Sequence, residues 1–574
     1  MKIFREKRFL LLLLSALCGG LFPLNAAVGP EAGFISLDPN AFYFHNNSYF
    51  NRIALLSSPT RLWYVFQPAD HDPASKPLFV FFNGGPGSAT SCGLLAANTG
   101  RTAVVLDGAT GEASIIDNPH SWTRLGNVIY FDARTTGFSY SLMDDPGDAD
   151  RRFLEFDAQN YNAFTDGADV LRALLRFLAG HSEIRPNPVV FVPESYGGIR
   201  TVVMLHLLLN SEDYVDGTAV YQNPDLVREI RDHFAAVFPE YAGQAVPRNV
   251  IARQFGRQIM IQTVMSTPYQ RIVGTAMLET PGSTLYQVAE ETGVPYIPYR
   301  NRPGANQNPT PGEIQNYIYD YLYAVGRDPY HLAKPAGFLD GHRQATGGLL
   351  RQIDSLNRLI GTDARAIPEL YAAYRAQAYK VRPMAEAEVN FSASVGPPPA
   401  PLPPGEGGLD AVFGVLQPWD RFFIDSNRDA LNAFSWNQAE LMEYDLTHGT
   451  TLLYGKMFLE NVAWVETFAT NAAYDVVVYS PALADALGMY VYILSRSTFD
   501  SGNPQDGPRP GRILLDYRSG AVRDFAGGRR TIRFPRYASS GHAVSMTEPG
   551  EFLEDVADWL ESTGFIRNGK GGLK

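Results

Sequence analysis

A buried strand that runs directly into a serine and then into a helix is the feature that most restricts the fold of this chain. Residues 188–192 read Pro-Val-Val-Phe-Val, an apolar run without alternation that is typical of a strand buried on both faces. The run continues through Pro193 and Glu194 to Ser195, and a glycine pair then opens a helical pattern over 200–209. This strand–turn–helix predicts a nucleophile elbow, in which a tight turn exposes the serine hydroxyl. An ordinary strand–helix turn has the same local pattern, so this motif alone leaves both interpretations open.

Short apolar runs alternate with helical patterns on both sides of this motif. That alternation predicts an α/β protein with a mainly parallel central sheet covered by helices on both faces. The region from about 268 to 453 differs, because it has helical patterns and few strand runs, which predicts a large, mostly helical cap inserted into the core. We therefore expect a first core part over 28–270, a cap over 271–455 and a second core part over 456–574. The expected strands are 61–67, 77–82, 127–131, 258–264, 476–479, 512–515 and 531–534, and the expected helices include 163–178, 315–325, 368–379 and 551–561.

The first 27 residues have the pattern of an export signal. Basic residues precede a short apolar run over 9–17, and Asn25-Ala26-Ala27 offers a site for signal peptidase. The pattern predicts a signal peptide over 1–27 and an exported mature protein, either periplasmic or secreted. A retained membrane anchor is the alternative. No later stretch reaches about 18 uninterrupted apolar residues, so we expect no stable membrane insertion after cleavage.

Charge and cysteine content restrict the partners. The chain has 574 residues and a formal net charge of −12, and this negative field disfavours nucleic-acid binding. Cys18 and Cys92 are the two cysteines, and cleavage of the signal would remove Cys18. A large exported chain without an internal disulfide suits a bacterial protein. No spacing typical of metal ligands is visible, so we expect neither a metal nor another cofactor.

A reactive serine needs a base and an oxyanion hole. His542 follows a predicted strand and precedes the closing helix, which suits the order Ser, acid, His of the α/β-hydrolase plan. The acid is expected after the strand 476–479, where Asp485 is the first carboxylate. Glycines in the turn 83–87 would let a backbone amide join that of Tyr196 at the oxyanion, although a plain strand-ending turn is the alternative. The weaker candidates for the acid are Asp475, before that strand, and Asp500, further on.

Several motifs in order resemble the serine carboxypeptidases (peptidase family S10), which have an α/β-hydrolase fold. The resemblance extends from about residue 60 to 565 and leaves out the cap. It implies that Ser195 is the nucleophile and His542 the base, with the amides of Gly85 and Tyr196 as the oxyanion hole. It further implies that Asn83, Gly84 and Glu194 bind the C-terminal carboxylate of the substrate. The motifs are Asn83-Gly84-Gly85-Pro86-Gly87-Ser88, Asn118-Pro119-His120-Ser121-Trp122, Asp132 with Gly137-Phe138-Ser139-Tyr140, Glu194-Ser195-Tyr196-Gly197-Gly198, and Gly541-His542.

The chain departs from that family's pattern at four places. Pro193 stands where members usually have Gly, and the run 479–485 before Asp485 lacks a Gly and is one residue longer than the family's. Ala543-Val544-Ser545 replaces the common Met-Val-Pro after the histidine, which would reshape the pocket for the leaving residue. Ser88 replaces a frequent Cys, in keeping with the missing disulfides.

The leading hypothesis from the sequence is an exported serine carboxypeptidase that acts on peptide or protein C-termini through an acyl-enzyme and is favoured at acidic pH. The catalytic residues would be Ser195, Asp485 and His542, in a monomer or homodimer. An acyltransferase or esterase with the same triad is the second hypothesis, because an alcohol can also capture the acyl group. A non-enzymatic binding protein is the third, and only Pro193 and the irregular segment before Asp485 favour it.

Overall fold

The computed structural model describes the core of the chain and parts of the middle. Its longer described stretches are 28–39, 41–44, 54–56, 59–84, 90–95 without 92, 99–106, 113–134, 138–143, 163–211, 221–262, 284–307, 464–472 and 543–565. Pieces of one to three residues are described within 317–383, 457–461 and 515–540. The expected signal peptide over 1–27 and the expected strand 476–479 lie outside the described residues. Within the described stretches, no helix combines the length and the apolar character needed to cross a bilayer.

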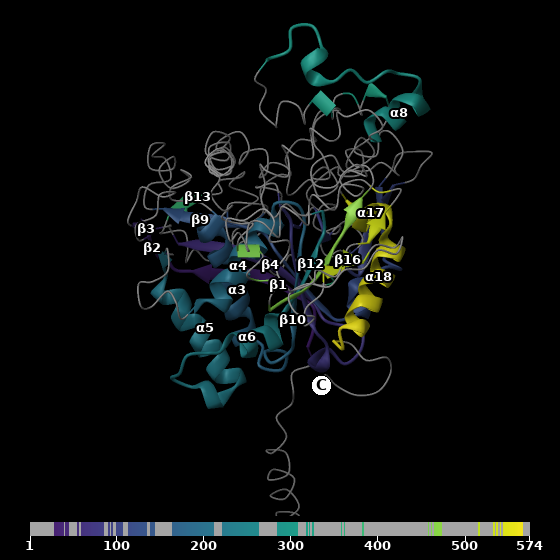
Figure 1. Cartoon of the computed structure of the whole chain (residues 1–574). Coiled ribbons are helices and arrows are strands. Elements are labelled where there is room, and N and C mark those ends of the chain that lie inside the picture. The colour runs from purple at the N-terminus through teal and green to yellow at the C-terminus, as the bar shows by residue number, and fades with distance from the viewer. Residues whose placement is uncertain are drawn as a thin grey trace, which may run out of the picture.

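A sheet of eleven strands forms the centre of the described structure (Figure 1). From β8 through β5, β10, β12, β14 and β17 to β16, every neighbouring pair is parallel. At the other end, β4 pairs antiparallel with β8 and with β1. This confirms the predicted mainly parallel sheet, and β10, the strand before Ser195, lies in its middle. The strands are β1 (Glu31–Leu37), β4 (Thr60–Gln67), β5 (Leu78–Phe82), β8 (Asn127–Phe131), β9 (Tyr140–Met143), β10 (Val189–Pro193), β12 (Arg257–Met260), β13 (Val381–Pro383), β14 (Glu466–Ala469), β16 (Leu515–Asp516) and β17 (Ile532–Arg533).

Alternate side chains of the central strands enter two separate cores. In β5, Val80 and Phe82 pack on one face of the sheet, while Phe79 and Phe81 pack on the other. The side chains of β10 alternate between the two cores in the same way. Since successive residues of a strand point to opposite faces, a strand without polar alternation requires cover on both faces.

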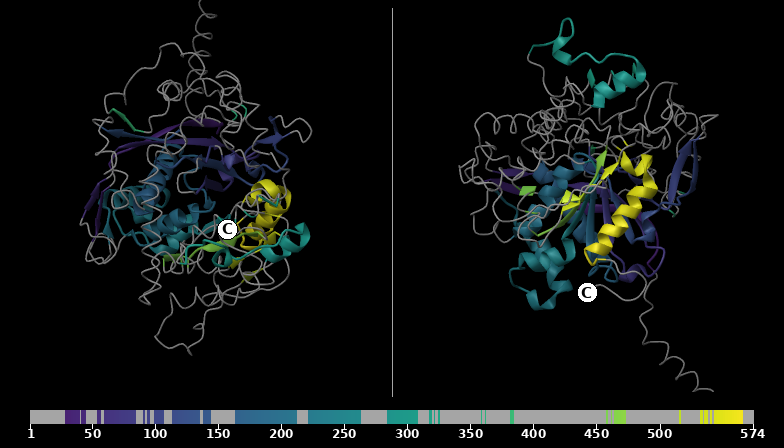
Figure 2. Two further views of the ribbon diagram at one scale, coloured as in Figure 1. Left: turned by 90° about the horizontal axis from the view of Figure 1, so that it is seen from above. Right: turned by 45° about the vertical axis from the view of Figure 1, so that its right-hand side comes forward.

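Helices supply that cover on each face. Against the first core lie α3 (Ala163–Gly180), α4 (Gly197–Leu209), α5 (Pro224–Val237) and α6 (Arg248–Phe255). Against the second lie α17 (Val544–Thr547) and α18 (Pro549–Ser562), and Figure 2 shows α18 in yellow across the sheet. With its mainly parallel sheet, two helical layers and central strand ending at a serine, the chain has an α/β-hydrolase fold.

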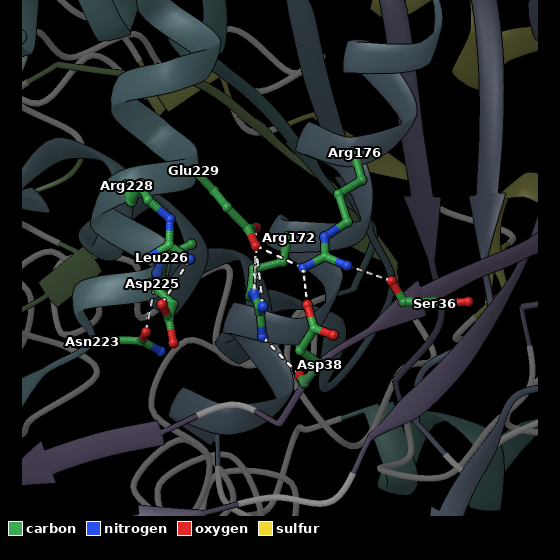
Figure 3. Close-up of polar contacts among 9 residues, drawn as sticks. All are labelled: Ser36, Asp38, Arg172, Arg176, Asn223, Asp225, Leu226, Arg228 and Glu229. Atoms are coloured by element: carbon green, nitrogen blue, oxygen red, sulfur yellow. Dashed lines mark hydrogen bonds and ion pairs between the residues drawn. The ribbon is translucent and has the colours of Figure 1, made fainter. Parts of the chain in front are cut away.

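An ionic cluster ties the N-terminal strand to two of these helices (Figure 3). The buried guanidinium of Arg172 on α3 donates to Glu229 on α5 and to the Asp38 carbonyl, just after β1. Arg176 donates from Nη2 to both Glu229 and Asp38, at 2.9 Å each. The bond from Arg176 holds the pKa of the Asp38 carboxyl below its ordinary value. Two arginines thus share one half-buried glutamate, an arrangement that keeps a buried charge compensated.

The middle of the chain contributes a strand to the core sheet. The helix α8 (Thr284–Thr292) lies on the side toward which β14 points (Figure 1). The described residues within the expected helix 315–325 are helical or in a turn, and the expected helix 368–379 lies outside the described part. Residues 381–383, inside the predicted cap, form β13, which lies at the edge of the sheet and pairs with β9. A search for helical periodicity cannot reveal a strand of three residues that forms only by pairing with a strand far away in the sequence.

Smaller elements complete the described structure. The strands β2, β3 and β11 form one small sheet, β6 and β7 another, and β15 and β18 a third. Their bounds, with those of the short 3-10 helices, are β2 (Ala41–Phe44), β3 (Ala54–Leu56), β6 (Thr102–Leu106), β7 (Ala113–Asp117), β11 (Tyr221–Gln222), β15 (Asn471–Ala472), β18 (Arg536–Tyr537), η1 (Pro73–Ser75), η3 (Trp122–Arg124), η5 (Pro239–Tyr241) and η6 (Tyr299–Asn301).

Candidate functional site

Ser195 occupies a sharp turn between β10 and α4. Its φ of 55° lies in the left-handed region, which is rare for a residue with a side chain and is found where surrounding contacts impose it. Those contacts are visible: the Ser195 amide donates to the Ile261 carbonyl at 3.0 Å, and the Gly198 amide donates back to the Ser195 carbonyl at 3.0 Å. The helix α4 begins at Gly197, so the positive end of its dipole faces the serine. This is the geometry expected for a nucleophile elbow.

Pro193 fits this turn because the strain lies at another residue. Pro193 is the last residue of β10 and pairs with Phe82, while the positive φ belongs to Ser195. The Pro193 carbonyl accepts from the Ile261 amide at 2.8 Å. A Cβ on Gly197 would lie 3.2 Å from the Pro193 Cβ and 2.9 Å from the Phe82 carbonyl oxygen. Close packing at the elbow therefore requires a glycine at position 197 and tolerates the proline at position 193.

The turn after β5 lies directly against the elbow. A Cβ on Gly84 would come within 2.3 Å of the Tyr196 nitrogen and 2.7 Å of the Glu194 carbonyl oxygen. Two backbone segments approach this closely only when no side chain separates them, which explains the glycine. Gly85, the first of the two predicted oxyanion donors, lies outside the described residues. The second, Tyr196, is buried directly after the serine.

Asn83 and Glu194 form a direct side-chain pair beside the serine. The Asn83 Nδ2 donates to Glu194 Oε1 at 2.7 Å. The Leu94 amide donates to Asn83 Oδ1 at 2.9 Å, and since an amide N–H can only donate, this bond fixes which end of the Asn83 amide faces Glu194. A Cβ on Gly93 would lie 2.5 Å from Asn83 Oδ1, so glycine there leaves room for the asparagine. The pair joins the two turns that the sequence predicted to meet.

A buried aspartate anchors the loop that holds Asn83. Asp132, at the end of β8, accepts from the Ser91 amide and hydroxyl at 2.9 Å and 2.8 Å and from the Phe138 amide at 3.0 Å. Thr90, next to Ser91, accepts from the Asn83 amide at 3.0 Å. A fully buried carboxylate is stable only with such donors. The motif that contains Asp132 therefore supports the site from behind.

Sequence reasoning missed a buried arginine at the site. Arg200 lies in the first turns of α4 with 2% of its surface exposed. Its Nη1 donates to the Asn83 carbonyl at 2.7 Å, and its Nε donates to Asp166 Oδ2 on α3 at 2.8 Å. An arginine near a helix start usually reaches solvent, and Asp166 is 34 residues away in the chain, so no local pattern reveals the pair.

The other predicted triad residues, His542 and Asp485, lie outside the described residues, as does Asp475. The segments that precede two of them are described. β15 and β18 pair in parallel, with Asn471 opposite Arg536 and Ala472 opposite Tyr537. In the part of the chain that the structure describes, no group of three or more His, Cys, Asp and Glu side chains is arranged to hold a metal ion.

Comparison with known proteins connects part of the chain to one family. Residues 48–220 match the sequence model of a family described as serine carboxypeptidase. Serine carboxypeptidase-like 5 of Arabidopsis thaliana is 31% identical over 144 residues, which are 24% of this chain and 29% of the relative. Serine carboxypeptidase-like 16 of the same plant is 28% identical over 173 residues, 29% of this chain and 34% of the relative. The chain thus spans about a third of the length of these curated relatives.

Solved structures align with most of this chain at low sequence identity and with TM-scores below 0.5. Kex1Δp, a prohormone-processing carboxypeptidase from Saccharomyces cerevisiae, is 12% identical with a TM-score of 0.47, and the alignment covers 95% of this chain and 94% of that one. The peroxisomal α/β-hydrolase Lpx1 from the same yeast is 11% identical with a TM-score of 0.33, covering 94% and 91%.

Proposed function

We propose that this chain, whose residues 48–220 match the sequence model of the serine carboxypeptidase family, is an exported serine carboxypeptidase that removes C-terminal residues from peptides or proteins. The observation that carries the proposal is the elbow with Ser195 at positive φ, beside the Asn83–Glu194 pair. The elbow suits a nucleophile, and the pair suits recognition of a terminal carboxylate. The pattern over 1–27 supports export.

The chemistry proceeds in two acyl transfers. Ser195 Oγ attacks the carbonyl carbon of the last peptide bond while His542 accepts the hydroxyl proton, and the amides of Gly85 and Tyr196 stabilise the oxyanion. His542 then gives the proton to the leaving nitrogen, the C–N bond breaks, and an ester to Ser195 remains. Water, activated by His542, hydrolyses that ester and restores the serine. The alternative acyltransferase or esterase differs only in the acyl donor or in the group that captures the acyl chain.

The carboxylate site explains the proposed preference for acid. A substrate carboxylate beside the Glu194 carboxyl is tolerated only when the two groups share a proton. Asn83 donates to Glu194 and is itself fixed by the Leu94 amide, so the pair presents a preorganised edge to the substrate. Binding should weaken as Glu194 ionises, which raises KM toward neutral pH.

The triad acid is a choice between two aspartates. Asp485 is the first carboxylate after the predicted strand 476–479, but β14 already ends at Ala469. Asp475 follows the end of β15 by three residues, and His542 follows the end of β18 by five. β15 and β18 pair in parallel, so Asp475 and His542 follow paired strands by short connections. This spacing along the chain favours Asp475 over Asp485, which follows β15 by thirteen residues.

The test is release of the terminal amino acid from N-blocked dipeptides between about pH 4 and 8, a range that spans carboxyl titration. We expect release that requires Ser195 and a KM that rises with pH. Ser195→Ala should abolish turnover, and Glu194→Gln should flatten the rise in KM. Wild-type-like turnover by Ser195→Ala would refute the proposal.

A second reagent separates the alternatives. Labelling of Ser195 by a fluorophosphonate without any peptide release would point to a different acyl donor, and ester substrates with alcohol acceptors would then be compared. Failure of the folded protein to label would favour a binding protein without enzymatic activity.

A further inference from the structure

The Arg200 guanidinium contacts both turns of the candidate site from the buried side. It donates to the Asn83 carbonyl at 2.7 Å, where β5 ends, and lies 5.4 Å and 5.7 Å from the ring centres of Phe82 and Tyr196. Arg200 also forms an ion pair with Asp166 on α3, at 2.8 Å. A planar guanidinium held by a carboxylate, a carbonyl and two rings has little freedom to turn.

The bond from Arg200 acts on one peptide unit. The Asn83 carbonyl and the Gly84 N–H belong to the same planar trans peptide, so the two groups point in opposite directions. A donor that fixes the carbonyl on the buried side therefore aims the Gly84 N–H away from Arg200. Among the residues that the structure describes, none accepts a hydrogen bond from that N–H. A charged donor on the carbonyl also polarises the peptide and strengthens the opposite N–H as a donor.

We propose that Arg200 is a positioning residue that aims and polarises the Gly84 N–H toward the terminal carboxylate of the substrate. The inference rests on the proposed carboxypeptidase function, since Gly84 is one of the groups assigned to that carboxylate. Arg200 does not touch the substrate in this arrangement. Arg200 should affect how strongly the enzyme prefers a substrate with a free C-terminal carboxylate over one with an uncharged terminus. It should not affect the reactivity of Ser195.

The counterion determines which variants are informative. Burial raises the pKa of the Asp166 carboxyl, and the neighbouring Arg200 guanidinium opposes that rise. Replacing Arg200 alone would leave a buried carboxylate without that partner, which confuses stability with function. The double variant Arg200→Gln/Asp166→Asn removes both charges together.

A neighbouring pair gives a matched control. Arg134 donates to Asp169 at 2.7 Å and to the Ser141 hydroxyl at 3.1 Å, and both members of this pair are buried. The double variant Arg134→Gln/Asp169→Asn makes the same change in composition one turn along α3. A functional loss caused by general loosening of buried ion pairs would occur in both double variants.

The experiment compares kcat/KM for an N-blocked dipeptide with a free C-terminus against the same dipeptide as its amide. In Arg200→Gln/Asp166→Asn we expect the acid-to-amide ratio to fall about tenfold, the order of effect of one charged hydrogen bond, mainly through KM for the free acid. The control pair should keep the ratio within about twofold, and the rate of fluorophosphonate labelling at Ser195 should stay similar in all variants. Where the double variant does not fold, Arg200→Lys retains the charge but loses the guanidinium fork, and its ratio should fall about threefold.

Three results would overturn the inference. One is an unchanged ratio in folded Arg200→Gln/Asp166→Asn or in Arg200→Lys. Another is an equal fall in the control pair, which would assign the effect to general packing. The third is a wild-type protein that releases amino acids without preferring the free acid, which removes the carboxylate site itself. A wild-type protein that releases no amino acid at all fails the proposed function instead, and Ser195 labelling identifies that case separately.

Discussion

Replacing Gly84 with alanine tests the contact between the turn after β5 and the elbow. The added Cβ would lie 2.3 Å from the Tyr196 nitrogen, 2.7 Å from the Glu194 carbonyl oxygen and 2.9 Å from the Gly197 nitrogen. All three are backbone atoms, so no side chain can rotate away from the new methyl group. Ordinary contact begins at 3.4 Å, and the two segments would have to separate by about 1.1 Å at the closest point.

That separation has different consequences for stability and for catalysis. Inserting a methyl group into a tightly packed position costs about 1 to 3 kcal/mol of folding free energy. Displacing catalytic groups by about 1 Å can reduce the rate by about 100-fold. For Gly84→Ala we therefore expect kcat/KM and the rate of Ser195 labelling to fall by about 100-fold, in a protein that still folds cooperatively.

The measurement pairs urea unfolding with fluorophosphonate labelling and dipeptide turnover. Gly180→Ala is the matched control, because no heavy atom lies within 4 Å of a Cβ built at this last residue of α3. An alanine near a helix end should leave activity unchanged and stabilise the protein by up to about 1 kcal/mol. Labelling and turnover within twofold of wild type in Gly84→Ala would refute the close packing of Gly84 on the elbow.

Two further predictions concern titration and the triad acid. Burial lowers the pKa of His233 from 6.5 to about 4, so the unfolded chain binds this proton first, and stability should fall by up to about 3 kcal/mol as pH drops from about 6.5 to 4. His233→Gln should flatten this decline in urea unfolding at several pH values, and an unchanged slope would contradict the assignment. For the acid, Asp475→Asn should reduce kcat by about 10⁴-fold while Asp485→Asn leaves it near wild type. The opposite result, a large loss of kcat in Asp485→Asn alone, would identify Asp485 as the acid.

Sequence reasoning located the strands whose own residues already indicate burial on both faces. The runs that became β5, β8 and β10 are apolar at every position or nearly so, and only burial on both faces accommodates them. The Ser195 turn was equally accessible, because the strand, the serine and the glycine pair are contiguous. The resemblance assigned Asn83 and Glu194 to one site, and the structure shows a hydrogen bond between their side chains.

The contacts that the sequence could not predict join polar residues far apart in the chain. Arg200, Asp166 and the Asn83 carbonyl come from three elements, and each looks unremarkable in its own segment. The same holds for Arg172, whose partner Glu229 lies 57 residues later. A charged residue on a helix is usually solvated, so only the fold shows which of them are buried and paired.

The strand β14 shows how one such contact alters the choice of the acid. Its sequence, Glu466-Thr467-Phe468-Ala469, has two polar residues, yet all four are buried. Thr467 is accommodated because its partner comes from β12, where Gln258 Nε2 donates to Thr467 Oγ1 at 2.9 Å. The sequence predicts a further strand at 476–479, with Asp485 as the first carboxylate after it, and both lie outside the described residues. With β14 ending at Ala469, the first carboxylate after the strand is Asp475, which is why the two asparagine variants test the acid directly.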